Sequence, residues 1–494
     1  MFVSHGFHSL AVRAKLGRFV FDRLLQKDLA QYSAPERIRM CFEALGPTFV
    51  KLGQLLATRP DLIPQEYSEE FKKLHDQVPG VAFAEMEALL RAHFGASLDE
   101  IFVEFDPVPL AAASIAQVHR AVLKDGSRVV VKIQRPGIAK TIAEDLQILK
   151  GLAEMLDRYI PETRPYNPQG IVAEFGRSME LETNFIVEAN NVRRFASNFA
   201  MEPNIKIPQV YGQYTGRRVL VLEALDGVPL SQSSALLQEG TSPEEVLRRG
   251  LRAYMKMIYT DGLFHGDLHA GNVLILPNNQ IGLIDFGIVG RLNRKTQGAI
   301  ANMFLALGEE DYDRLAYMYV DLAPFTERID VDQFARDLRD LIAPYFGLTT
   351  KNVNLGRLLL DSTAVASRHG LALPTELVIF FKSIISLEGM GRVILKDFDF
   401  LSYSMEFAKE LVLARMEPKR MFSEASVFAR DLNSLVGTLP RQLKQVLRRL
   451  NDPDFTVQFR SGDIEALRKT MERGFWLMFW GLIFAALILG LLLR

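Results

Sequence analysis

The sequence predicts an α+β fold of two lobes, in which a small β-rich lobe precedes a larger helical lobe. Short segments rich in Val, Ile and Phe begin near residue 101 and are typical of strands. Longer stretches with helical periodicity lie before and after them. The segment Lys124–Ser127 separates two strand-like segments and favours a hairpin. For 494 residues we expect two or three domains, at roughly 150 residues per domain.

Residues 1–100 are predicted to form a helical region. Ser33 and Glu36 form a capping box with Pro35 in the first turn, so a helix should begin there. Apolar residues then recur at helical spacing until Pro60. Further helices are predicted at 65–75 and 83–94.

The rest of the chain mixes strands and helices. Strands are predicted at 101–106, 115–123, 128–134, 205–213 and 217–224, and long helices at 138–160 and 168–199. From about 244 onward helices dominate, interrupted by short strands at 273–276 and 281–284. These elements predict a β-rich lobe with inserted helices over 101–225 and a helical lobe with an extension over 226–470.

The segment 475–493 is predicted to be a transmembrane helix. It contains no charged side chain, and at about 1.5 Å per residue it spans roughly 28 Å, close to the hydrocarbon thickness of a bilayer. Trp476 and Trp480 stand at its start, where interfacial rings are favoured, and basic residues precede it. One such segment predicts a single-pass protein, and the basic flank predicts that the remaining chain is cytoplasmic. The alternative is a buried helix.

Charge and cysteine content narrow the functional classes. The net charge of -1 gives no general electrostatic reason to bind nucleic acid. The single cysteine, Cys41, excludes an intrachain disulfide, which fits a reducing compartment. Cys41 lies in an apolar helical pattern, which favours a packing role over that of a nucleophile.

The most informative segment is His265–Asn272, which is followed by Asp285-Phe286-Gly287. Protein kinases carry H-R-D-L-x-x-x-N and then D-F-G, and Asp267 and Asn272 have that internal spacing. Phosphoryl transfer needs Mg²⁺ held by oxygen ligands, which Asn272 and Asp285 supply, and a carboxylate that faces the acceptor, here Asp267. The two segments together predict a protein-kinase-like site that binds ATP and Mg²⁺.

A zinc site is the competing interpretation of His265, Asp267 and His269. Zinc needs three or four converging ligands, and no further His or Cys cluster stands nearby. We therefore expect His265 to hold the backbone of the loop.

Upstream, Arg128–Ile133 resembles the kinase strand V-A-I-K, whose lysine contacts the α- and β-phosphates. A lone lysine at the end of an apolar strand usually just extends to water. The position of Lys132 after a hairpin and before the Asp267 loop favours the functional role. One hairpin earlier, alanines at 111–113 replace the glycines of a kinase phosphate loop. Alanine restricts the backbone, so this loop should be stiffer and differently shaped.

Four segments together resemble the UbiB family of atypical kinases, which includes mitochondrial proteins supporting coenzyme Q synthesis. They are Pro109–His119 (P-L-A-A-A-S-I-A-Q-V-H), Lys51–Gln54 (K-L-G-Q), Glu180–Asn190 and the H-x-D-x-H-x-G-N loop. The resemblance runs from about residue 35 to 300. It implies a two-lobed protein-kinase-like fold with an added N-terminal helical K-x-G-Q subdomain that covers the place where a protein substrate would bind.

The resemblance also implies roles for individual residues. Lys51 and Gln54 match the K-x-G-Q pair and would enter the active site, and Glu188 would pair with Lys132. Glu182 matches the first acid of an E-x-D element, whose third position is Asn184 here. Six positions apart on one helix, Glu182 and Glu188 should face different partners, which suits Lys51 and Lys132. Nucleotide binding would involve Ala111, Ala112, Ala113, Ser114, Ile115 and Glu223.

The expected function is that of a UbiB-type atypical kinase or ATPase that supports ubiquinone biosynthesis at a membrane, the bacterial inner membrane in the first place. Its expected partners are a membrane lipid or prenyl-quinone precursor and enzymes of quinone synthesis, and no nucleic acid. Two alternatives stay open. One is a Ser/Thr or small-molecule kinase, and the other is a nucleotide-gated scaffold without turnover.

Overall fold

The computed structural model describes residues 32–415, apart from residue 58 and the segments 60–61, 75–79, 161–162, 164–166, 233–241, 324–328, 346–353 and 396–397. The described residues up to Leu413 belong to one compact unit. The predicted transmembrane helix at 475–493 lies outside the described residues. Within the described part of the chain, no helix is long and apolar enough to cross a membrane.

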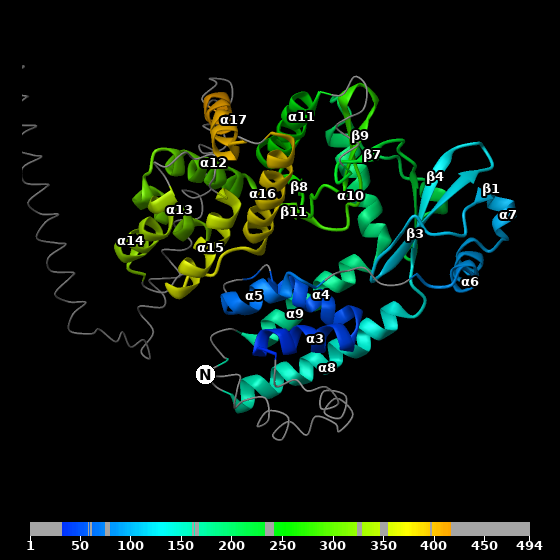
Figure 1. Ribbon diagram of the computed structural model, residues 1–494, viewed down its shortest axis with the longest axis horizontal. Coiled ribbons are helices and arrows are strands. Elements are labelled where there is room, and N and C mark those ends of the chain that lie inside the picture. The colour runs from blue at the N-terminus through cyan, green and yellow to red at the C-terminus, as the bar shows by residue number, and fades with distance from the viewer. Residues whose placement is uncertain are drawn as a thin grey trace, which may run out of the picture. The chain divides into compact units, whose positions relative to one another are not determined.

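An antiparallel five-stranded sheet forms the small lobe (Figure 1). Its strands are β1 (Phe102–Phe105), β2 (Ala111–Ala112), β3 (Ala116–Leu123), β4 (Arg128–Gln134) and β6 (Val219–Glu223), in the order β1-β3-β4-β6 with β2 on β3. The β3–β4 hairpin confirms the turn predicted at Lys124–Ser127. Gly126 there has a φ of 84°, which glycine adopts at little cost.

Helix α6 (Phe83–Phe94) packs against this sheet. Its buried Met86 and Leu90 share a core with Val129, Val131 and Val219. Although 83–94 forms the helix expected from the sequence, its packing places it with the β-rich lobe. The short helix α7 (Leu98–Ile101) leads directly into β1.

A separate helical subdomain is formed by segments on both sides of the first four strands (Figure 1). It contains α3 (Ala34–Leu45), α4 (Pro47–Ala57), α5 (Gln65–Phe71), α8 (Ile138–Tyr159) and α9 (Pro168–Glu182). The predicted capping box at Ser33 and Glu36 begins α3. Phe49 and Leu52 of α4 pack with Leu149 of α8 and Phe175 of α9, so this subdomain has its own apolar core.

Two predictions of secondary structure were wrong. The single helix expected at 168–199 is broken into α9 and α10 (Phe185–Asn198), because Asn184 caps α10 by accepting a hydrogen bond from Ile186 N. The strand expected at 205–213 is divided: β5 (Ile205–Lys206) pairs with β10, and Val210 forms an isolated bridge to Leu222 of β6. Pro208 has no N–H to continue a ladder.

The larger lobe is mainly helical and continues from α11 (Pro243–Lys256). A second sheet has the order β5-β10-β9-β7, and β11 pairs with β8. The strands are β7 (Val228–Pro229), β8 (Leu263–His265), β9 (Val273–Leu276), β10 (Gln280–Leu283) and β11 (Val289–Arg291). The helices that follow are α12 (Arg294–Gly308), α13 (Tyr312–Leu322), α14 (Val331–Ile342), α15 (Leu355–Arg368), α16 (Thr375–Ile394) and α17 (Phe400–Arg415).

Candidate active site

A cavity of about 1020 Å³ lies between the small sheet and the loops of the larger lobe, and the helical subdomain also contributes to it. Its lining contains most of the residues predicted from the sequence. They are Lys51, Ala111, Ala113, Ser114, Ile115, Lys132, Glu188, Glu223, Asp267, Asn272 and Asp285. The structure therefore brings together residues that are more than two hundred positions apart in the chain.

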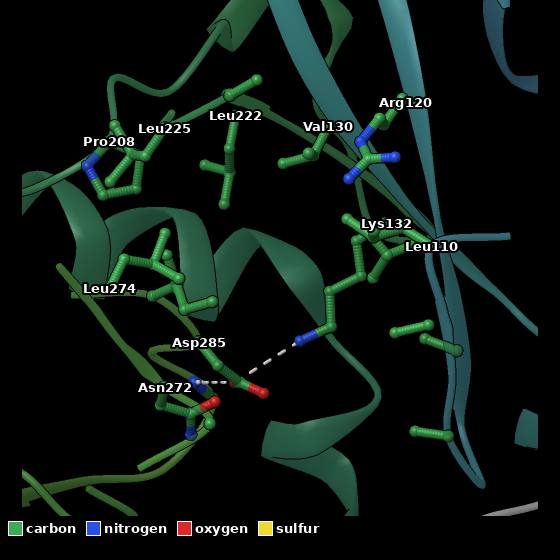
Figure 2. A pocket seen from close by; sticks show the side chains of 18 of the residues that line it. Leu110, Arg120, Val130, Lys132, Pro208, Leu222, Leu225, Asn272, Leu274 and Asp285 are labelled. Atoms are coloured by element: carbon green, nitrogen blue, oxygen red, sulfur yellow. Dashed lines mark hydrogen bonds and ion pairs between the residues drawn. The ribbon is translucent and has the colours of Figure 1, made fainter. Parts of the chain in front are cut away.

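Lys132, at the end of β4, is the central cation of the cavity. Its Nζ lies 2.8 Å and 2.9 Å from the two carboxylate oxygens of Glu188 on α10. It also lies 3.5 Å from Asp285 Oδ1, and Figure 2 shows the two side chains facing each other with Asn272 beside Asp285. Burial disfavours the ammonium, but Asp285 and Glu188 outweigh burial and raise the pKa of Lys132. The Lys132–Glu188 pair predicted from the family resemblance is present.

Asp285 sits in a backbone conformation that few residues adopt. Its φ is 61°, in the left-handed region, and its Oδ1 accepts a hydrogen bond from Gly287 N at 3.2 Å. The Lys132 ammonium lowers the pKa of Asp285 to about 2, so the carboxylate is ionised at neutral pH. Such a strained, charged residue in a cavity is typical of a functional position.

Phe286 anchors this loop in the protein. It is fully buried, and its ring lies 4.8 Å from the ring of Phe195 on α10, measured between centroids. Asn191, also on α10, donates a hydrogen bond of 3.0 Å to the Phe286 carbonyl. Helix α10 thus holds both Lys132, through Glu188, and the loop that carries Asp285.

His265 holds the backbone of the candidate catalytic loop, His265–Asn272, as the sequence predicted. Its Nδ1 accepts a hydrogen bond from Asp267 N, and its Nε2 donates to Ile284 O. Burial lowers the pKa of His265 and keeps the ring neutral. Nδ1 of His269 accepts a hydrogen bond from Gly271 N. Both ring nitrogens of His265 are thus used by the backbone, which argues against the zinc interpretation in which His265 is a ligand.

Asp267 and Asn272 are held on the same loop. The Asn272 side-chain amide donates to Asp267 O at 3.0 Å, which leaves its Oδ1 as a potential metal ligand. The Asp267 carboxylate contacts Lys382 of α16, with Nζ 3.0 Å from Oδ1. Burial opposes its ionisation, but the ammonium of Lys382 outweighs burial and lowers the pKa of Asp267.

The alanine-rich loop closes the cavity from the small lobe. Ala111 and Ala112 form β2, and Ala113 N donates to Ala116 O in a tight turn. Arg135 Nε donates to Ala113 O at 2.7 Å, which fixes the turn from outside. The Ser114 hydroxyl is buried, and among the described residues it has no hydrogen-bond partner. An unpaired buried hydroxyl on a cavity wall is suited to a polar ligand.

The other end of the cavity is apolar. Val130, Leu222, Leu225 and Leu274 line it, as Figure 2 shows. Glu223 also lines the cavity, but its carboxylate already accepts a hydrogen bond from Gln209 N and pairs with Lys206 at 2.7 Å. An apolar slot beside a polar end is the usual form of a site for a small molecule such as a nucleotide.

The helical subdomain contributes Lys51 to the cavity. Its Nζ lies 2.8 Å from Glu182 Oε1, so the predicted separation of partners holds: Glu182 meets Lys51 and Glu188 meets Lys132. The two glutamates lie on different helices, however, and not on one. Gln54 is placed differently from Lys51. Its amide donates to Leu74 O at 3.1 Å, and it is not among the described residues that line the cavity.

Lys382 is a site residue that the sequence prediction did not include. The signal was available, since Lys382 is a lone cation within the apolar run Leu377–Ile385 of α16. In a predominantly apolar helix segment, such a residue needs a partner or access to water. Its partner Asp267 is 115 positions away in the sequence, so no short motif could contain both residues.

The donor set fits a magnesium nucleotide. Mg²⁺ is usually held by one or two carboxylates together with substrate phosphates, and not by a protein cage. Asp285 and Asn272 offer a carboxylate and an amide oxygen. The described residues contain no cluster of three or more His, Cys, Asp or Glu side chains suited to hold a metal ion. Lys132 and Ser114 stand where they can contact phosphate oxygens.

Two family models match the chain. Residues 73–319 match the ABC1 atypical kinase-like domain, and residues 338–399 match the UbiB helical domain. The second match includes α15 and α16, which lie beyond the region where the sequence motifs showed the resemblance. A solved Mycobacterium tuberculosis complex with erythromycin is 25% identical, with a TM-score of 0.49, and covers 83% of this chain and 100% of its own.

Curated relatives extend the similarity over most of the chain. "Probable protein kinase UbiB" of Pseudomonas putida (strain W619) is 33% identical over 452 residues, which cover 90% of this chain and 84% of the relative. The protein of the same name from Marinobacter nauticus is 33% identical over 84% of this chain and 74% of its own length. The chain therefore belongs to the UbiB family of atypical kinases.

Proposed function

We propose that this protein binds Mg-ATP in the cavity and breaks its terminal phosphoanhydride bond in support of ubiquinone biosynthesis at a membrane. The observation that carries the proposal is the meeting of Lys132 from the small lobe with Asn272 and Asp285 from the larger lobe in the lining of one cavity, which the alanine-rich loop also lines. This is the arrangement of charges that phosphoryl transfer requires.

Each residue has a separate task in the proposed reaction. Lys132 binds phosphate oxygens, and Glu188 keeps its ammonium in place. Asn272 and Asp285 would hold Mg²⁺, which neutralises the phosphate charge when bound. Asp267 faces the attacking oxygen. That oxygen forms a bond to the γ-phosphorus, the bond to the β,γ-bridging oxygen breaks, ADP leaves with the electron pair, and the proton of the attacking group passes to solvent or product.

The helical subdomain at the cavity favours hydrolysis, or transfer to a small acceptor, over phosphorylation of a protein. Its Lys51 and Glu182 line the cavity as a largely buried pair. Contacts beyond the cavity fix the covering subdomain. Thr375 of α16 donates to Glu174 of α9 at 2.8 Å, and Arg357 of α15 pairs with Glu69 of α5 at 2.8 Å. An extended peptide would have to displace these helices.

The proposed substrate side is a prenyl-quinone precursor or another membrane lipid, and the proposed location is the bacterial inner membrane with the catalytic domain in the cytoplasm. Family membership supports the ubiquinone role. The apolar segment 475–493 supports the membrane role, and enzymes of quinone synthesis are the proposed protein partners. Removing residues 475–494 should release the protein from membranes in a flotation assay. A truncated protein that still floats would point to a second anchor.

Turnover is the direct test. Purified full-length protein in detergent should bind a fluorescent ATP analogue and hydrolyse ATP, with stimulation by precursor-like phenols. Asp285→Asn should lower turnover by at least on the order of 100-fold. Asp313→Asn makes the same chemical change at an exposed position on α13 and should have no effect. Neither nucleotide binding nor hydrolysis in the wild type would end the proposal.

Quinone profiling by mass spectrometry links turnover to the pathway. Cells without this protein should contain less ubiquinone, and the wild-type gene should restore it. The Asp285→Asn gene should not. Full restoration by Asp285→Asn would favour a scaffold that acts without turnover.

A further inference from the structure

Helix α16 lies directly against the catalytic loop. A Cβ added at Gly266 would lie 2.8 Å from Ile379 Cγ2, so the loop and the helix approach too closely for a larger residue there. The rings of Phe380 and Phe264 meet at 6.1 Å between centroids, and Ser383 Oγ donates to His265 O at 3.4 Å. The helix thus fixes the loop from the side opposite the small lobe.

One polar side chain extends from this helix to the reacting end of the loop. Lys382 Nζ lies 3.0 Å from Asp267 Oδ1. The side chains of Lys382 and Asp267 are 37% and 39% exposed, so solvent and a ligand can reach both. Asp267 lines the cavity, and Lys382 contacts it from the rim.

The pair decides how the Asp267 carboxylate is oriented. A partly exposed carboxylate can rotate, and a charge-assisted hydrogen bond to one oxygen restricts that rotation. With Oδ1 held by Lys382, the other oxygen is presented to the attacking group. The ammonium also places a positive charge close to the point where negative charge develops on the transferred phosphoryl group.

We propose that Lys382 is a positioning residue of the active site, which orients Asp267 and makes the UbiB helical domain part of the reaction centre. This inference rests on the proposed phosphoryl-transfer function. It assigns a role to a helix outside the part of the chain that matches the kinase-like domain.

Turnover kinetics of the full-length protein provide the first test. Lys382→Met should lower kcat on the order of 10- to 100-fold and leave the KM for ATP within about threefold, because the nucleotide contacts are elsewhere. Lys382→Arg keeps the charge and the hydrogen bond and should retain most of the activity. Lys295→Met, on α12, removes a lysine that contacts only a backbone carbonyl in the described structure, and should match the wild type. An unchanged kcat in Lys382→Met would overturn the proposal.

A structural role alone gives a different pattern. In that case Lys382→Met and Lys382→Arg would lose activity equally, and the thermal midpoint of both would fall. The double variant Lys382→Met/Asp267→Asn supplies a further test. If Lys382 acts through Asp267, the double variant should be no slower than Asp267→Asn alone. Losses that multiply would overturn the proposal.

Amine-labelling followed by mass spectrometry tests the pair without turnover. An ammonium held by a carboxylate reacts slowly, so Lys382 should label severalfold faster in Asp267→Asn than in the wild type, while Lys295 should not change. Equal labelling of Lys382 in the two proteins would contradict the pair even if the protein hydrolyses ATP. A labelling difference in a protein without ATP turnover would instead show that the pair exists and that the proposed function fails.

Discussion

Two lysines form ion pairs with residues that line the same cavity, and the two pairs differ in burial. At the proposed nucleotide end Lys132 pairs with Glu188, whose side chain is only 5% exposed. At the proposed acceptor end Lys382 pairs with Asp267, and both side chains are more than one-third exposed. The first pair joins a strand to a helix within the kinase-like lobe. The second joins the catalytic loop to an additional helical domain.

Because of this difference in burial, the two pairs should contribute differently to the stability of the protein. A buried charge that loses its partner is strongly destabilising, whereas an exposed pair contributes little because water and salt screen it. The Lys132–Glu188 pair therefore contributes to the stability of the fold. The Lys382–Asp267 pair contributes little to stability, so its loss should affect turnover more than folding.

The largest expected effect comes from Lys132→Met. It removes a phosphate contact and leaves Glu188 buried without its main partner. Turnover should fall by at least about 100-fold, and the free energy of unfolding by about 3 kcal/mol. Urea denaturation and an ATPase assay measure the two losses. Lys140→Met breaks an exposed pair with Glu144 and should change neither. A stable, active Lys132→Met protein would show that the buried Lys132–Glu188 pair matters no more for stability than the exposed Lys382–Asp267 pair.

The second prediction concerns Glu388, which links α16, the helix that carries Lys382, to α15. Glu388 lies on the same helix as Lys382 and accepts hydrogen bonds from Leu355 N and Gly356 N at the start of α15. Burial raises the pKa of Glu388 from 4.5 to about 7. The folded state therefore favours the protonated acid. Its stabilising contribution is complete below the unfolded pKa and is lost as pH rises through about 7.

Thermal midpoints should show this dependence as a fall of several degrees between pH 5 and pH 8. Glu388→Gln keeps one carbonyl acceptor but cannot ionise, so its midpoint should vary less over the same range. The difference between the two proteins isolates Glu388 from other titrating groups. Parallel curves would show that α16 is held independently of this group.

The third prediction addresses the loop over the phosphates. Ala113→Gly removes a methyl group and frees the backbone of the turn, so the affinities for ATP and ADP should change severalfold relative to each other. Titration of both nucleotides measures the ratio. Ala139→Gly, at an exposed position early in α8, serves as a control for the same substitution. An unchanged ratio would mean that the alanines do not shape the phosphate site.

The smallest expected effect is on the stability of Lys382→Met. Because the pair is more than one-third exposed, its loss should change the free energy of unfolding by less than about 1 kcal/mol, as judged by urea denaturation. A small change in stability together with a large loss of turnover would sharpen the comparison. A loss as large as that of Lys132→Met would show that both ends are structural.

The nucleotide end could be predicted from sequence because short motifs specify it. Lys132, Asn272 and Asp285 each lie in a segment whose neighbours fix the local backbone, and a known motif gave their order along the chain. The capping box at Ser33 and the hairpin at Lys124–Ser127 were predictable for the same local reason. Both have the expected geometry.

The contacts of the helical subdomain and of α16 were only partly predictable because tertiary packing determines them. Lys51 was found through the family resemblance, but Gln54 bonds to the Leu74 carbonyl, a contact that helical spacing does not reveal. Lys382 meets Asp267 only after α16 packs on the loop. The apolar pattern over 168–199 is continuous and favours one helix. The structure has two helices with a break between them, because the Asn184 side chain caps the start of α10.

That break has a thermodynamic consequence. Glu182 and Glu188 stand on either side of a two-residue turn, so the partner of Lys51 and the partner of Lys132 cannot move independently. Any ligand whose binding shifts α10 must also act on the covering subdomain through Glu182. By linkage, a lipid that alters the nucleotide affinity by some factor must itself bind more tightly or more weakly by the same factor when the nucleotide is present.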